Sequence, residues 1–101
     1  MTAVFRAIVD PTRRQILEYL RAGELSAGEI AGRFDISAPS ISRHLSILLS
    51  AGLIEKRRDG NRLLYRLCPE TLVHALSGFL GKVCPTQVLH RRSRKTRGQT
   101  P

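Results

Sequence analysis

The sequence predicts a mainly helical domain with one small β-hairpin. Before Gly52, apolar residues recur at helical spacing in separate segments, and capping residues mark the segment ends. After Gly52 the apolar period changes to two, and two such runs flank Asp59-Gly60-Asn61-Arg62, which is typical of a hairpin turn. A helical stripe returns after the hairpin. The predicted order is therefore four helices, two strands and a last helix.

The first two helices are predicted on either side of Asp10-Pro11. Asp is a good N-cap residue and Pro a good first helical residue, so the second helix starts at Pro11 and runs to about Ala22. Gly23 then ends it. One side of residues 1–9 is apolar through Val4, Phe5 and Ile8. The second helix turns Ile16, Leu17 and Leu20 inward.

Two further helices are joined by only a few residues. Ser26 and Glu29 have the spacing of a capping box, which opens a helix over about 27–34. Ser37 caps the next helix, Pro39 falls in its first turn, and Gly52 ends it. The core-facing stripe of this helix is Ile41, Leu45, Leu48 and Leu49. Two short helices so joined form a helix-turn-helix.

The opposite side of the helix after Ser37 carries small polar groups, one Arg and one His. Its residues are Ala38, Pro39, Ser40, Ser42, Arg43, His44 and Ser46. Ser and Arg reach base edges when a helix lies in the major groove of DNA. This segment alone is equally compatible with an ordinary amphipathic helix that has a Ser-rich solvated face.

The hairpin comprises residues 53–58 and 63–67, and its basic tip occupies the place of a wing. The last helix runs from Pro69 to about Val83, with Leu72, Val73, Leu76, Phe79 and Leu80 as its apolar stripe. From residue 85 the composition becomes basic and polar, so we expect 85–101 to be a mostly disordered tail. Residues 1–84 form the predicted winged helix-turn-helix domain.

The chain is strongly basic, with 17 Lys and Arg against 8 acidic residues and a formal net charge of +9. This balance favours a polyanionic partner, above all nucleic acid, although a basic soluble surface would also produce it. No run of about 18 apolar residues and no export leader is present, so we expect a cytoplasmic protein without a membrane segment.

Several motifs together resemble the ArsR/SmtB family of winged-helix bacterial repressors. The matching segments are Asp-Pro-Thr-Arg-Arg-Gln-Ile-Leu from Asp10, residues 24–31, Ser37 to Leu45, Ala51-Gly52-Leu53-Ile54, Arg58-Asp59-Gly60 and Tyr65-Arg66-Leu67. They lie within about residues 4–67. Their combination is specific, whereas no single segment would be.

The resemblance implies a repressor that binds double-stranded DNA, and it suggests a role for each polar side chain. Arg43 is the best candidate for a bidentate contact to guanine, with Ser40, Ser42 and Ser46 facing bases or phosphates. Ser37 is first a cap, and His44 is either a structural helix residue or a base reader. Arg13 and Arg14 either reach phosphate or form an internal salt bridge with Asp10. On the wing we expect Arg58, Asn61 and Arg62 to contact the DNA backbone or minor groove.

The resemblance also implies a homodimer formed by the first and last helices. The residues expected at that interface are Val4, Phe5, Ile8, Leu72, Leu76, Phe79 and Leu80. The same residues could also cover the core of their own chain, and we expect both roles. In a two-fold dimer, the two copies of the helix that follows Ser37, the expected reading helix, lie about 34 Å apart. This spacing predicts an inverted-repeat operator.

The sequence indicates several alternatives for the signal that regulates the repressor. Metal-sensing relatives often carry a Cys-x-Cys pair where this chain has Ser26 and Gly28, so we expect no metal or other cofactor. A redox response through Cys68 and Cys84, bridging two protomers, is an alternative to two inert thiols. The chain is most similar to the autorepressor-type (SdpR-like) branch, whose members lack the metal ligands. That branch implies control by the protein's own concentration or by a regulatory partner protein.

Other classes of protein fit the sequence less well. An enzyme is not expected, because no Gly-rich phosphate loop, paired carboxylates or nucleophile–base set is apparent. A non-specific nucleic-acid-coating protein would need more aromatics than the five present, or a more basic reading helix. A winged helix used only for protein contacts would not need the basic wing residues Lys56, Arg57, Arg58 and Arg62.

Overall fold

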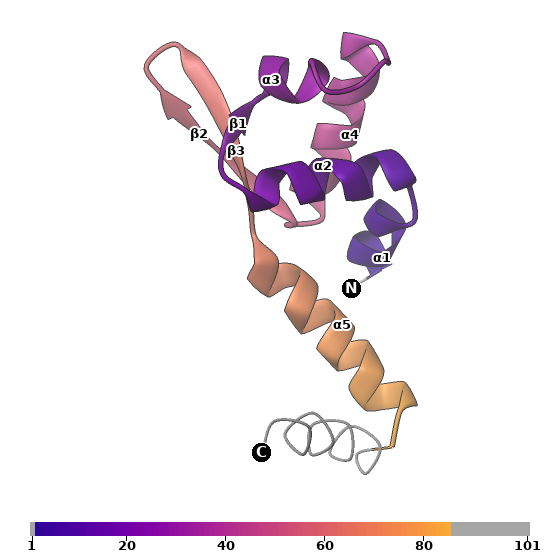
Figure 1. The fold of residues 1–101 in the computed structure, drawn as a ribbon. Coiled ribbons are helices and arrows are strands. Elements are labelled where there is room, and N and C mark those ends of the chain that lie inside the picture. The colour runs from indigo at the N-terminus through magenta and orange to yellow at the C-terminus, as the bar shows by residue number, and fades with distance from the viewer. Residues whose placement is uncertain (1, 86–101) are drawn as a thin grey trace, which may run out of the picture.

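The structure, a computed structural model, describes residues 2–85. It contains helices α1 (Thr2–Ile8), α2 (Pro11–Arg21), α3 (Ala27–Ala31), α4 (Ala38–Ser50) and α5 (Pro69–Val83), and strands β1 (Leu25–Ser26), β2 (Ile54–Asp59) and β3 (Arg62–Leu67). Helices α1–α4 pack together, the β2–β3 hairpin projects to one side, and α5 extends away as an arm (Figure 1). The predicted mainly helical winged helix-turn-helix is confirmed.

The predicted helix starts are confirmed by their capping hydrogen bonds. The Asp10 carboxylate accepts from the backbone N–H groups of Thr12 and Arg13 at 2.8 and 3.1 Å. Ser26 and Glu29 form both bonds of the capping box. The Ser37 hydroxyl accepts from the Ser40 N–H at 3.3 Å. Each cap satisfies a donor that the first helical turn leaves without a partner.

Two expectations about the region before α4 were wrong in detail. Helix α3 ends at Ala31 rather than near Phe34, because Gly32 caps it and the chain continues in tighter turns, with Arg33 and Phe34 donating to Ile30 and Ala31. The short strand β1 was missed. It pairs antiparallel with β3, Leu25 opposite Tyr65, and gives the sheet the order β1-β3-β2.

Each strand of the hairpin extends one residue further toward the tip than predicted. Asp59 and Arg62 belong to the strands and face each other as the last pair before the turn. Gly60 has φ +65°, whereas Asn61 does not have a positive φ, so only the glycine takes the left-handed conformation. The turn therefore has two residues with Gly in the first position, and turns of this kind match the twist of the flanking strands.

The core lies between α1–α4 and the sheet. Its largest fully buried side chains are Ile16, Ile30, Ile41, Leu48 and Leu53. Helix α5 contributes only one buried residue, Ala75. Three other apolar side chains of α5 face outward: Leu76, Phe79 and Leu80 are 36%, 46% and 42% exposed. Among residues 2–85 no helix has the length and apolar character needed to cross a membrane.

Candidate nucleic-acid interface

Helix α4 separates a buried side from an exposed polar side. Ile41, Leu45 and Leu48 are buried, while Ser42, Arg43 and Ser46 are exposed. Ser37 and Pro39 are also exposed at the start of the helix, and Ser40 and His44 are half-buried. The apolar stripe therefore holds the helix on the core and orients the Ser and Arg side chains outward.

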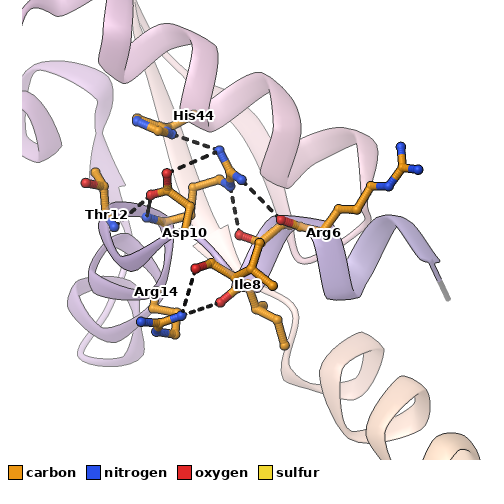
Figure 2. Close-up of polar contacts among 9 residues, drawn as sticks. Arg6, Ile8, Asp10, Thr12, Arg14 and His44 are labelled. Carbon is orange, nitrogen blue, oxygen red and sulfur yellow. Dashed lines mark hydrogen bonds and ion pairs between the residues drawn. The ribbon is translucent and has the colours of Figure 1, made fainter.

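The junction between α1 and α2 contains two arginines that bind backbone carbonyls. Arg13 donates to the carbonyls of Ala7 and Arg6 at 2.7 and 3.1 Å. Arg14 donates to the carbonyls of Ile8 and Val9 at 2.7 and 3.1 Å (Figure 2). The last carbonyls of a helix have no partner within it, so both arginines act as caps for α1. The sequence left their role open between phosphate and internal contacts, and the contacts in the structure are internal.

Arg13 also reaches helix α4. Its Nη1 lies 3.1 Å from Nδ1 of His44, which comes from α4 (Figure 2), and 4.0 Å from the Asp10 carboxylate. Burial raises the pKa of Asp10, but the N–H groups of Arg13 and Thr12 and the Arg13 charge outweigh it, so the pKa lies below its ordinary value. One polar cluster thus links α1, α2 and α4.

An open cleft of about 250 Å³ lies over this cluster. Its lining residues are Asp10, Arg13, Ser40, Arg43, His44 and Ile47. It therefore combines residues of the α1–α2 junction with residues of the polar side of α4. Arg43 forms no ion pair within residues 2–85, so its guanidinium has no acidic partner in that part of the chain.

Two ion pairs fasten the wing to the segment around β1 and α3. Arg57 binds Glu24 with two bonds of 2.8 Å, and Arg62 binds Glu29 at 2.8 Å. The bonds from Arg57 lower the pKa of Glu24. The Ser26 N–H, and then Arg62, lower the pKa of Glu29. These acidic partners were not predicted from the sequence, because each lies 33 residues from its arginine.

The other two wing residues expected at DNA face solvent. Arg58 and Asn61 are both exposed, and Arg58 has no ion pair among residues 2–85. Of the three wing positions expected at DNA, only Arg62 is therefore held by an acidic side chain. Arg66, further from the tip, pairs with Glu55.

The residues expected at a dimer interface fall into two groups. Val4 is 4% exposed and lies in the core of its own chain, and Leu72 and Ile8 pack partly against that core. Leu76, Phe79 and Leu80 are the exposed members. Phe5, half-buried, touches Phe79 edge-on. Within one chain Val4 therefore belongs to the core, whereas Leu76, Phe79 and Leu80 are left partly open to solvent.

The candidate thiol and metal residues are dispersed. Cys68 and Cys84 are free and half-buried at the two ends of α5. Burial, and then the Glu55 carboxylate, raise the pKa of the Cys68 thiol. Within the described part of the chain no three His, Cys, Asp or Glu side chains gather to hold a metal ion. The basic tail predicted for 85–101 lies outside the described residues except for residue 85.

Comparisons with known proteins agree on one family. Residues 10–56 match the family described as "Bacterial regulatory protein, arsR family". The chain is 46% identical over 80 residues to "Transcriptional repressor SdpR" of Bacillus subtilis (strain 168), covering 79% of this chain and 89% of that protein. It is 45% identical over 64 residues to the "HTH-type transcriptional regulator KmtR" of Mycobacterium tuberculosis, covering 63% of this chain but only 49% of that protein.

Solved structures show the same fold. An "ArsR-like Transcriptional Regulator from Rhodococcus sp. RHA1" has a TM-score of 0.77 and 27% identity over 99% of this chain and 91% of its own. The "ArsR family transcriptional regulator, RHA00566" has a TM-score of 0.73 and 29% identity, covering 89% of each chain.

Proposed function

This chain belongs to the arsR family of bacterial regulatory proteins, and from that premise we propose that it is a dimeric, metal-independent repressor of an inverted-repeat operator. The observation that carries the proposal is the polar side of α4. A buried stripe holds this helix on the core, and its exposed side presents serines and an arginine without an acidic partner among residues 2–85. These are side chains that read base edges in the major groove.

The proposed DNA surface consists of α4 and the wing. It comprises Ser37, Pro39, Ser40, Ser42, Arg43, His44, Ser46, Arg58, Asn61 and Arg62. Arg43 supplies a bidentate donor suited to guanine, and the small hydroxyls let the helix approach the bases closely. Arg58 and the hairpin tip contact the backbone and set the register of the protein on the duplex.

The proposed dimer uses the exposed side of α5 together with α1. Leu76, Phe79 and Leu80 form an apolar surface that residues 2–85 leave partly open to solvent. Exposed apolar surfaces of this kind mark contacts with another molecule, and a second copy of the chain satisfies it by two-fold symmetry. Two copies then present two reading helices to successive turns of the duplex.

The proposed control is by the protein's own concentration or by a partner protein. The name of the 46% identical relative, "Transcriptional repressor SdpR", supports repression. The name "Arsenical resistance operon repressor" of a 33% identical relative from Staphylococcus xylosus shows that the family includes resistance regulators. In this chain Ser26 and Gly28 replace the thiolates of the metal-sensing motif. The raised pKa of Cys68 favours the protonated thiol, which does not support a redox signal.

Selection from a random duplex pool at about 150 mM salt tests this function. Enrichment of an inverted repeat with half-sites about one helical turn apart would support a dimeric, sequence-specific repressor. Titration of the selected DNA with zinc, chelator and oxidant then tests the signal, and release by any of them would overturn metal independence or redox silence. Binding that selects no sequence and fades with salt would identify a charge-driven coating protein instead.

A further inference from the structure

Arg13 is placed where it can connect the proposed dimer helix to the reading helix. Its Nε and Nη2 donate to the last carbonyls of α1, and its Nη1 meets His44 of α4. The side chain is only 12% exposed, so it is held by these contacts rather than extended into solvent. No phosphate contact is needed to explain its position.

The contact with Arg13 determines which nitrogen of His44 carries the proton. A guanidinium is always protonated and has donors only, so the Nδ1 atom facing Arg13 has to accept. A neutral imidazole that accepts at Nδ1 carries its hydrogen on Nε2, at the other side of the ring. His44 therefore offers an N–H donor on the edge away from Arg13.

We propose that Arg13 is a positioning residue that locks His44 in the Nε2–H form, so that α4 presents this donor to an acceptor atom of DNA. His44 lines the open cleft with Ser40 and Arg43, both of which belong to the proposed DNA surface. The acceptor is an oxygen or nitrogen of a base edge or a phosphate. The inference rests on the proposed function, and it adds a residue of the α1–α2 junction to the recognition of DNA.

The protonation pattern is measured on the protein without DNA. Imidazole ¹⁵N spectra at about pH 8, where a free imidazole is neutral, should show His44 protonated at Nε2 and bare at Nδ1. The Arg13→Met variant should lose this preference. Arg14→Met is the matched control, because Arg14 also caps α1 carbonyls but makes no contact with His44. A His44 signal from the Nδ1–H form would overturn the proposal.

The role in recognition is measured with two His44 variants that keep Arg13. His44→Gln places its amide near the position of Nε2, whereas His44→Asn places it near Nδ1. We expect His44→Gln to bind the selected operator nearly as the unaltered chain does, and His44→Asn to lose about threefold to tenfold, the effect of one hydrogen bond. Equal binding by both variants, or the reverse order, would overturn the proposal. A loss on the selected site alone indicates a base acceptor, and an equal loss on any duplex indicates a phosphate.

Arg13→Met should weaken operator binding as His44→Asn does, with an unchanged slope of log K against log salt. A slope reduced by about one would mean that Arg13 itself binds a phosphate, contrary to the proposal. If the unaltered chain selected no sequence, the proposed function would fail. The spectra of the free protein would then still decide whether Arg13 sets the His44 proton.

Discussion

The ring of Phe5 in α1 meets the ring of Phe79 in α5 edge-on, with centroids 5.5 Å apart and planes inclined at 68°. This contact joins the first helix to the last at the surface proposed for dimerisation. Phe79 nevertheless remains 46% exposed, so Phe5 covers only part of it. The aromatic pair thus belongs both to the fold of one chain and to the face proposed for dimerisation.

Leu76→Glu is expected to convert the dimer to a monomer. A carboxylate at the centre of an apolar interface would be buried without a partner, which is strongly unfavourable. Because Leu76 is 36% exposed in the single chain, the fold itself should persist. Sedimentation velocity measures the change, and operator binding should be lost with it. For the sedimentation measurement, Leu63→Glu is the matched control, a leucine with 40% exposure on the wing, away from α5. An intact Leu76→Glu dimer would contradict the role of α5.

Arg43→Ala is expected to weaken binding to the selected operator by about 1–3 kcal/mol, because one bidentate contact to a base is lost. The melting temperature should hardly change, since the side chain is exposed and has no ion pair within residues 2–85. Fluorescence anisotropy with selected and scrambled duplexes measures both affinities. Arg21→Ala serves as control, because it removes an exposed basic side chain at the end of α2. An Arg43→Ala chain that unfolds would show that this helix is wrongly oriented here.

Glu29→Gln is expected to raise the affinity for DNA. Gln still accepts the Ser26 N–H in the capping box, but the negative charge beside Arg62 is gone. Without that charge the Arg62 guanidinium is held less strongly and can neutralise one more phosphate, so the slope of log K against log salt should steepen by up to about 0.9. Glu18→Gln removes an exposed charge from α2 and should have a smaller effect. An unchanged slope would show that Arg62 does not reach the backbone.

Asp10 is expected to make stability depend on pH in the acid range. Its folded pKa is lowered, so the ionised carboxylate stabilises the fold above the unfolded pKa of about 3.9, and this contribution disappears as the pH falls through the folded value. Urea unfolding should show Asp10→Asn less stable than the unaltered chain near pH 7 and equally stable in strong acid. Asp10→Ala should lose about 1 kcal/mol through the N-cap as well. A difference that grew in acid would contradict this assignment.

Cys68 is expected to react slowly with alkylating reagents. Burial and the Glu55 carboxylate raise its pKa, which lowers the thiolate fraction at a given pH. In a Cys84→Ser background, iodoacetamide at about pH 8.5 should modify Cys68 more slowly than free cysteine. Glu55→Gln should accelerate the reaction. A rate equal to that of free cysteine would contradict this prediction and would favour a redox response through Cys68.

The capped helix starts and the side of each helix that is buried could be read from the sequence. Asp10, Ser26 and Ser37 mark helix starts, because each accepts hydrogen bonds from residues two or three positions away. Apolar periodicity follows from the geometry of a single helix. The hairpin was likewise encoded at Gly60. The family followed from motifs that stand together along the chain. All of these signals are local.

Contacts between distant segments were decided only by the tertiary structure. The two-residue strand β1 exists because β3 lies beside it, and two residues carry no pattern of their own. Glu24 and Glu29 become partners of the wing only after folding brings together residues 33 positions apart. Arg13 and His44 are 31 positions apart, and their hydrogen bond depends on how α1, α2 and α4 pack. The sequence by itself determined which side chains face outward from α4, because helical periodicity is a local property. Which residues hold those side chains in place depended on the packing of distant segments, and no local pattern encodes that packing.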